Sequence, residues 1–314
     1  MTRAVRRASA RLQNGDRLAH LVASCFGVAV IVLTGLLAWE LWRNSALARQ
    51  AFGLGFLISQ TWDPVAGQFG ALPFVYGTLM TSAIALVLAV PIGIGVAIFL
   101  AELAPPRLSA IAGMLLELLA AIPSVIYGLI GIAVLVPLMR RFAQPALKAL
   151  LPGVPLVGGP VYGIGLLTAG LVLAIMVVPF IVSVGREVLL SVPREQREAA
   201  LALGATRWES TWKVVLPYAR PGLYGAIFLA LGRALGETMA VTMVIGNRPE
   251  IAASLFAPAY SMAAVIANEF SEAAEDLYLH ALIEIGLVLF LVTMIVNAVA
   301  RGLISATAEG GGAR

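Results

Sequence analysis

Two oppositely charged residues, Arg233 and Glu237, lie four positions apart within a long apolar run. Counting about 1.5 Å per residue from Gly222 places Arg233 near the middle of a membrane core about 30 Å thick, with Glu237 somewhat beyond it. On one continuous helix this spacing allows the two side chains to pair. An arginine that faces a transport path instead suits a small oxyanion, because its planar guanidinium can donate to two oxygens at once. Two interpretations follow: a structural ion pair, or a translocation path in which Arg233 meets an anion and Glu237 holds or releases Arg233.

The longest charged interval of the chain covers residues 191–222. Pro193 suits the first turn of a helix, and Gly204 suits the left-handed position just after a helix end. Thr206 followed by Glu209 matches a capping box, which predicts that a second helix begins there. We therefore expect a hairpin of two short helices with a glycine elbow.

Two prolines, Pro217 and Pro221, are expected to end the second helix of this hairpin and to lead into the next apolar run. The hairpin is then either a solvated loop that joins two spans or a compact knob that docks on another protein.

The composition predicts an all-α integral membrane protein. Of 314 residues, 60% are hydrophobic and only 12% are charged, which excludes an ordinary soluble domain. We expect six transmembrane helices, at residues 21–42, 74–100, 111–138, 161–184, 223–245 and 277–299. Pro123 is expected to break the third span. Residues 43–72, 139–160 and 246–275 are then outer loops, the last of them partly helical.

The distribution of Lys and Arg predicts that both termini are cytoplasmic. With the N-terminus inside, fourteen of these residues fall in inner segments and six in outer loops, which also places residues 191–222 in the cytoplasm. A single cysteine, Cys25, and two separated histidines indicate neither a disulfide nor a metal site. No phosphate-binding Walker pattern or dinucleotide loop is present in the sequence, so energy from ATP must come from another chain.

Four further polar residues are candidates for a role in helix packing or at a gate. Glu117 and Glu284 lie nearer to span ends, where helix packing is a better interpretation than ligand binding. Asn268 and Glu269 lie in an apolar part of the third outer loop and are candidates to line an outer gate.

The charged hairpin resembles the EAA signature of ABC importer permeases through Glu198, Ala199, Ala200, Gly204, Leu216 and Pro217. The sequence Arg-Ala-Leu-Gly-Glu-Thr at 233–238, together with 118–128, 198–220 and 267–270, is similar to the phosphate-specific ABC transporter permeases of the C type. The resemblance covers roughly residues 74–301. One mild departure is Val214, where the family pattern often has isoleucine.

This resemblance implies a type I ABC importer permease fold, with the hairpin as the element that docks on an ATPase. Expected partners are a second, A-type permease, a pair of ATP-binding subunits, an external phosphate-binding protein and the lipid bilayer, with no nucleic acid. It implies a multi-pass protein of a prokaryotic plasma (inner) membrane that is not itself an enzyme and holds no cofactor. We expect a basic tail, first span and outer loop over residues 1–72, the permease domain over 73–303 and a tail over 304–314.

Three rival functions remain at this point. A permease for molybdate, sulfate or an amino acid would carry the same hairpin, although the deep Arg233–Glu237 pair favours a small oxyanion. An ion-coupled secondary carrier would leave the hairpin unexplained. A membrane-embedded enzyme would require clustered catalytic side chains, which the sequence does not offer.

Overall fold

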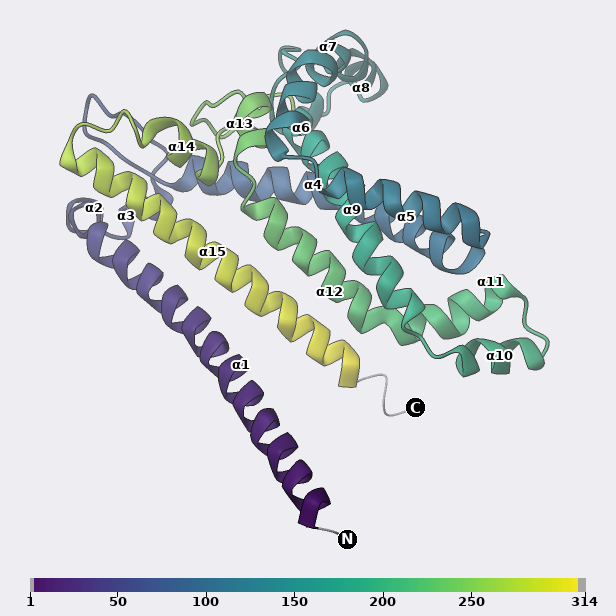
Figure 1. The fold of residues 1–314 in the computed structure, drawn as a ribbon. Helices are drawn as coiled ribbons and strands as arrows, with labels where there is room; N and C mark the ends of the chain where they lie inside the picture. Colours follow the sequence, from purple (N-terminus) through teal and green to yellow (C-terminus); the bar gives the residue numbers. More distant parts are fainter. Residues whose placement is uncertain (1–2, 310–314) are drawn as a thin grey trace.

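The structure is a computed structural model that describes the backbone of residues 3–309 and the side chains of residues 19–302 (Figure 1). Its helices, in chain order, are α1 (Arg3–Asn44), α2 (Ala46–Phe52), α3 (Gly55–Ile58), α4 (Leu72–Ile98), α5 (Pro106–Ala120), α6 (Ser124–Ile130), α7 (Val136–Leu138), α8 (Gln144–Leu150), α9 (Leu166–Leu190), α10 (Arg194–Ala202), α11 (Arg207–Ser210), α12 (Leu216–Leu235), α13 (Met239–Ile245), α14 (Met262–Glu269) and α15 (Asp276–Glu309). Short π-helical segments, η1 (Phe99–Leu103), η2 (Gly131–Leu135), η3 (Met139–Ala143) and η5 (Thr211–Val215), join several of them without a break, and a 3₁₀ turn, η4 (Pro155–Val157), follows α8.

Six helical segments within the described residues are long and apolar enough to cross a membrane, as the sequence predicted. They are Ala19–Asn44, Leu72–Leu103, Ser124–Leu150, Leu166–Leu190, Arg207–Leu235 and Asp276–Gly302. The all-α prediction is therefore confirmed, because the same residues contain only isolated bridge pairs and no sheet.

The centre of the fold is the contact between α4 and α9, which cross closely in the middle of the molecule. A Cβ atom at Gly93 would lie 2.7 Å from Ile181 Cγ2, and one at Gly170 would lie 2.5 Å from Ile84 Cγ2. Each helix therefore uses a glycine where the other presents an isoleucine. Small residues allow this close approach, which is how helices associate where lipid tails are as apolar as the side chains.

The boundaries predicted for the third span, residues 111–138, are wrong. The chain breaks at Ala121–Pro123, as Pro123 predicted, which leaves α5 as a separate helix. At 15 residues, α5 is about 22 Å long and too short to cross a membrane core alone. The helix after the break continues to Leu150, so the first half of the predicted outer loop at 139–160 is helical. Arg140, Arg141 and Lys148 favour a loop in the sequence, but long cationic side chains on a helix can extend toward water.

The fifth span also differs from the prediction, because Pro217 and Pro221 do not end the second hairpin helix. That helix runs without interruption from Arg207 through both prolines to Leu235. The π turn η5 stands directly before Pro217 and loosens the hydrogen-bond ladder at the point where proline contributes no N–H. The predicted single span over 223–245 is instead broken after Leu235, and α13 follows as a separate helix.

An aromatic cluster holds together the end of the molecule that carries α2, α3 and α14 (Figure 1). The predicted loop at 43–72 contains α2 and α3, and Trp62 lies within this cluster, with ring centroids 4.9 Å from Phe69 and 4.8 Å from Phe74. Its indole Nε1 donates to Glu269 Oε2 at 2.8 Å, and the Tyr278 hydroxyl donates to the same oxygen at 2.7 Å. Glu269 thus ties the loop before α4 to α14 and α15.

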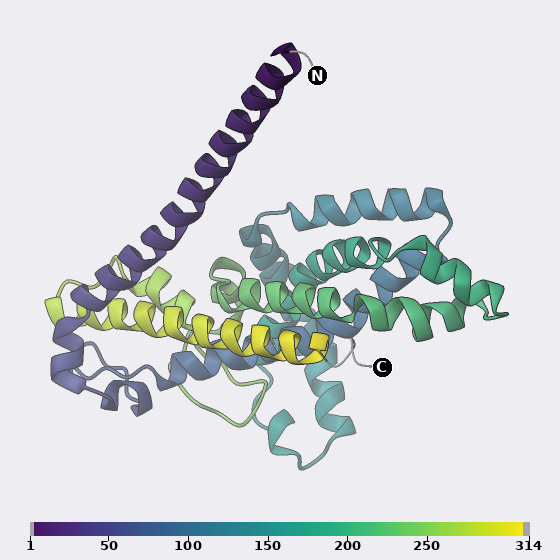
Figure 2. The same cartoon turned by 90° about the horizontal axis from the view of Figure 1, so that it is seen from below.

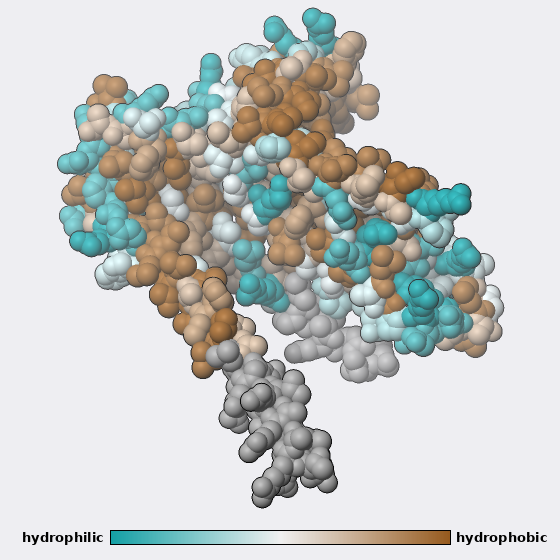
Figure 3. Space-filling view, viewed as in Figure 1, coloured by the Kyte–Doolittle hydropathy of each residue, from teal (hydrophilic) through white to brown (hydrophobic). Residues whose placement is uncertain are grey.

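The first span contacts α15 but leaves most of its surface uncovered. Figures 1 and 2 both show α1 projecting beyond the remaining helices, and the apolar side chains along its described part, including Phe26 and Ile31, are exposed. Figure 3 shows hydrophilic residues gathered at the end of the molecule that carries α10 and α11, while apolar surface covers the lobe formed by α6, α7 and α8. Such apolar helix surfaces require lipid or another protein around them.

The close approach of α4 to the segment before α14 makes a testable prediction. A Cβ atom at Gly77 would lie 2.1 Å from the carbonyl oxygen of Tyr260, whereas one at Gly95, on the same helix, would meet nothing within 4 Å. We expect Gly77→Ala to lower the free energy of unfolding in detergent by about 2 kcal/mol, as overpacking does. Gly95→Ala is the matched control and should be neutral or stabilising, by up to about 1 kcal/mol. Equal losses of stability in the two variants would contradict this packing.

Candidate functional site

The charged hairpin has the form that the sequence predicted. Gly204 has φ +86° at the elbow after α10, a conformation that side chains with a Cβ rarely adopt. Thr206 and Glu209 form the complete capping box at the start of α11: Thr206 Oγ1 accepts from Glu209 N at 3.2 Å, and Glu209 Oε2 accepts from Thr206 N at 2.9 Å. The elbow and the second helix are therefore fixed by local chemistry.

The predicted docking residues divide into two groups. Glu198, Ala199 and Gly204 are exposed on α10 and at the elbow, and Ala200 is half-buried. Leu216 and Pro217 lie instead at the junction between η5 and α12, where Leu216 packs against a buried cluster that includes Val215. The first group is exposed and can contact another protein, whereas Leu216 and Pro217 lie at the base of the hairpin, where α12 begins.

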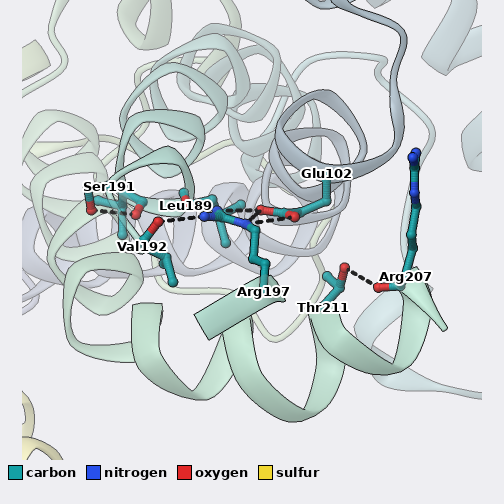
Figure 4. Close-up of polar contacts among 8 residues, drawn as sticks. Glu102, Leu189, Ser191, Val192, Arg197, Arg207 and Thr211 are labelled. Atoms are coloured by element: carbon teal, nitrogen blue, oxygen red, sulfur yellow. Dashed lines mark hydrogen bonds and ion pairs between the residues drawn. The ribbon is translucent and has the colours of Figure 1, made fainter. Parts of the chain in front are cut away.

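One residue that the sequence interpretation did not single out, Arg197, connects the hairpin to the spans (Figure 4). Its Nη2 donates to Glu102 Oε1 at 2.8 Å and to the carbonyl oxygen of Leu189 at 2.7 Å, and its Nε is 3.2 Å from both carboxylate oxygens of Glu102. Its Nη1 donates to the carbonyl oxygen of Val192. Arg197 lies on α10, Glu102 lies at the end of the second span, and the two carbonyls lie at the end of the fourth.

The second candidate site is formed by the break between α12 and α13. Arg233 lies in the last turn of α12 with its side chain exposed, and its guanidinium carbon is 5.9 Å from the ring centroid of Phe180. Glu237 lies after the helix end, is half-buried, and accepts through Oε1 from Ala240 N at 3.2 Å. The i,i+4 pairing expected of Arg233 and Glu237 does not form, since no ion pair joins them among the described residues and the helix ends between them.

The two broken helices meet each other. The α6 helix, which follows the break at Pro123, packs on α13, and a Cβ atom at Gly128 would lie 3.2 Å from Ala240 Cα. The Tyr127 hydroxyl donates at 2.8 Å to the carbonyl oxygen of Leu119 at the end of α5, which also accepts from Ile122 N at 3.2 Å. Two segments about 110 residues apart in the sequence, 118–128 and 232–241, thus form one region of irregular backbone.

Three of the four remaining polar candidates, Glu284, Asn268 and Glu269, have structural partners. Glu284 is buried and lies 3.5 Å from Arg49, which agrees with the predicted role in helix packing. Glu117 is exposed on α5. Asn268 donates to the hydroxyl of Tyr260 at 3.1 Å, and Glu269 holds the aromatic cluster described above. A gate role for Asn268 and Glu269 stays a hypothesis.

The described side chains offer no place for a metal ion, since no three His, Cys, Asp or Glu residues among them are grouped together. The sequence interpretation missed two contacts. Arg197 and Glu102 are 95 positions apart in the chain, and Arg49 and Glu284 are 235 positions apart. No periodicity or motif reports on such distant pairs, so nothing in the sequence pointed to them.

These features define a class of protein: a polytopic membrane permease with a broken central region and a charged helical hairpin at one end. The chain belongs to the family of binding-protein-dependent transport system inner membrane components, whose family model matches residues 89–307. It is 50% identical to a phosphate transport system permease protein PstC of Mesorhizobium japonicum, over 91% of this chain and 89% of that protein. It is 47% identical to the protein of the same name from Haemophilus influenzae, over 92% of this chain and 93% of that protein.

Two solved structures show the same fold. A chain of a bacterial alginate ABC transporter, in complex with a periplasmic protein that holds an alginate pentasaccharide, superposes with a TM-score of 0.60 at 16% identity and covers 91% of this chain and 94% of its own length. A chain of the MetNI methionine ABC transporter in an inward-facing conformation gives 0.57 at 18% identity, over 79% of this chain and 99% of its own length. The type I importer permease fold is therefore confirmed.

The capping box gives a prediction for the hairpin. We expect Thr206→Ala to cost the second hairpin helix about 1 kcal/mol, which corresponds to roughly fivefold faster amide hydrogen exchange in its first turns. Thr206→Ser retains the hydroxyl that accepts from Glu209 N and should exchange like the wild type. Equal acceleration in both variants would show that the cap is not what stabilises this helix.

Proposed function

We propose that this chain is the membrane-spanning permease subunit of an ABC importer that moves inorganic phosphate into the cell. Relatives that are 40–50% identical over most of the chain carry the name of phosphate transport permeases. The observation that carries the proposal in this structure is the exposed guanidinium of Arg233, beside the two helix breaks.

An exposed arginine within a span is costly in lipid, by about 3 kcal/mol or more at the bilayer centre. Irregular backbone at this depth also requires surrounding protein or a water-filled cavity. Arg233 meets both conditions if its side of the chain lines the transport path. Because a guanidinium offers two parallel N–H donors, it binds one face of a phosphate oxyanion. Glu237 is engaged by Ala240 N and leaves Arg233 unneutralised in this conformation, so an entering anion is the natural partner.

Energy for transport enters through the hairpin. The sequence has no phosphate-binding motif of its own, so we assign hydrolysis of ATP to separate ATP-binding subunits. Glu198, Ala199 and Gly204 stand exposed at the hairpin tip, where they are free to contact such a subunit. The capped helices make the hairpin a compact element, which transmits a displacement better than a flexible loop.

The other partners follow from the surfaces of the chain. A second, A-type permease is proposed to complete the path beside Arg233, and an external phosphate-binding protein to deliver the substrate at the end held by the aromatic cluster. Both termini and the hairpin are proposed to lie in the cytoplasm, which the excess of Lys and Arg on the hairpin side supports. Residues 73–303 are proposed as the permease domain, supported by a family match that begins at residue 89.

The test is ATP-driven uptake of labelled phosphate by vesicles that contain this chain with its partner subunits. We expect Arg233→Gln to reduce uptake by about 100-fold, within the range for a lost charged hydrogen bond of about 1.5–3 kcal/mol, while the complex still assembles and hydrolyses ATP. Arg220→Gln, on the same helix and also exposed, is the control and should transport like the wild type.

Other outcomes separate the alternatives. Failure of Arg233→Gln to assemble would assign Arg233 a structural role. Movement of molybdate or sulfate in place of phosphate would limit the proposal to the importer class. Uptake without any ATP-binding subunit would refute the importer mechanism.

A further inference from the structure

The contact between Arg197 and Glu102 is the part of the hairpin that the proposed function does not use. The exposed fraction of the Arg197 side chain is 20% and that of Glu102 is 10%, so the pair is largely shielded from water. The other ion pair of the hairpin, Lys213 with Glu209, spans 3.6 Å with exposed fractions of 75% and 44%. Exposed pairs of the second kind contribute little, whereas removing one partner of a shielded pair leaves an uncompensated charge.

The elements that Arg197 joins are not neighbours in the chain. Covalently, α10 is connected to α9 through the short turn that contains Ser191 and Val192, and to α12 through the elbow and η5. The second span, α4 with η1, has no covalent connection to the hairpin. The second span is linked to the hairpin by the hydrogen bonds between Glu102 and Arg197. Arg197 also donates to the carbonyl oxygens of Leu189 and Val192, at and just after the end of α9.

The ends of these spans are already tied together without the hairpin. The guanidinium of Arg186, on α9, donates to Ser109 Oγ at 3.1 and 3.3 Å, and Ser109 Oγ donates to the carbonyl oxygen of Leu100 at 2.8 Å. The ends of α4, α5 and α9 therefore form one block. Arg197 is the residue that attaches α10 to this block (Figure 4).

We propose that Arg197 is a positioning residue that, through Glu102 and the carbonyls at the end of α9, makes a displacement of the hairpin move the second and fourth spans together. This inference rests on the proposed function, because it concerns how the work of a bound ATPase reaches the transport path. The hairpin tip receives the displacement, and Arg197 passes it to α4, whose close contact with α9 carries it to the centre of the fold.

Arginine is required at this position for a geometric reason. Three of its nitrogens contact four acceptors: two on the second span, one at the end of the fourth span and one in the turn that follows it. A lysine ammonium has a single nitrogen at the end of a flexible stem and cannot reach all four from one place. Arg197→Lys therefore keeps the positive charge but loses the simultaneous contacts with Glu102 and with the carbonyls of Leu189 and Val192. Glu102→Gln keeps an acceptor of the same shape but loses the negative charge.

The experiment measures phosphate transported per ATP hydrolysed by the complete reconstituted complex. We expect Arg197→Lys and Glu102→Gln to assemble and to hydrolyse ATP, with the transport ratio reduced about tenfold, within the roughly 5–150-fold range of coupling between sites. Lys213→Gln removes the exposed ion pair of the same hairpin and should retain the wild-type ratio within about twofold. If Arg197→Lys does not assemble, the isosteric Glu102→Gln variant decides.

Two results would overturn the inference. A wild-type ratio in the assembled Glu102→Gln variant would show that the contact does not transmit the displacement. A proportional fall of hydrolysis and transport would show that Arg197 serves ATPase docking instead. A wild-type complex that moves another oxyanion refutes only the assignment of phosphate, and the ratio is then measured with that anion.

A covalent bridge provides a second measurement. Cys25 is the single cysteine, so Cys25→Ser gives a background in which Glu102→Cys with Arg197→Cys can be joined by a flexible bifunctional thiol reagent. We expect the cross-linked complex to recover most of the transport ratio that the unlinked double variant loses. Complete cross-linking without recovery would contradict a mechanical role.

Discussion

Hydrocarbon offers no hydrogen bonds to a peptide backbone, and this constraint decides where the chain can leave helical geometry. The chain breaks at 121–123 and at 236–238, and the helices that follow the two breaks, α6 and α13, pack on each other. The Tyr127 hydroxyl satisfies a carbonyl at the first break, and the Glu237 carboxylate satisfies an amide at the second. The two breaks thus form one region of irregular backbone, and the exposed side chain of Arg233 lies beside it.

The ends of the molecule follow a different logic. At the end that carries α2, α3 and α14, aromatic rings gather around the Glu269 carboxylate and fix the loop before α4. At the hairpin end, Arg186 and Arg197 bind side-chain and carbonyl oxygens at the ends of the second span, the fourth span and α5. Both arrangements use polar groups near the ends of the spans, where partial hydration lowers the cost of burying them. Between these two ends, α4 and α9 pack through glycine and isoleucine.

Two exposed surfaces of the chain require surroundings other than bulk water. The described part of α1 projects from the other helices with its apolar side chains exposed, and Arg233 is exposed although it belongs to a span. A lipid bilayer accounts for the first observation but not for the second. An exposed guanidinium requires a hydrated path or another polar surface, which agrees with a transport pathway formed between two permease subunits.

Composition, hydrophobic run length and local motifs were sufficient to predict six spans, the hairpin with its elbow and capping box, and the family. These features depend on residues within a few positions of one another, as the pairing of Thr206 with Glu209 illustrates. The sequence did not predict that the helix continues through Pro217 and Pro221, because proline weakens a helix without deciding whether packing outweighs the loss. It also allowed an Arg233–Glu237 ion pair as one of two interpretations, and that pair depends on an unbroken helix. The joining of Arg197 to Glu102 and the meeting of the two breaks were decided by tertiary structure alone, because burial and charge compensation between distant segments exist only once the helices have packed.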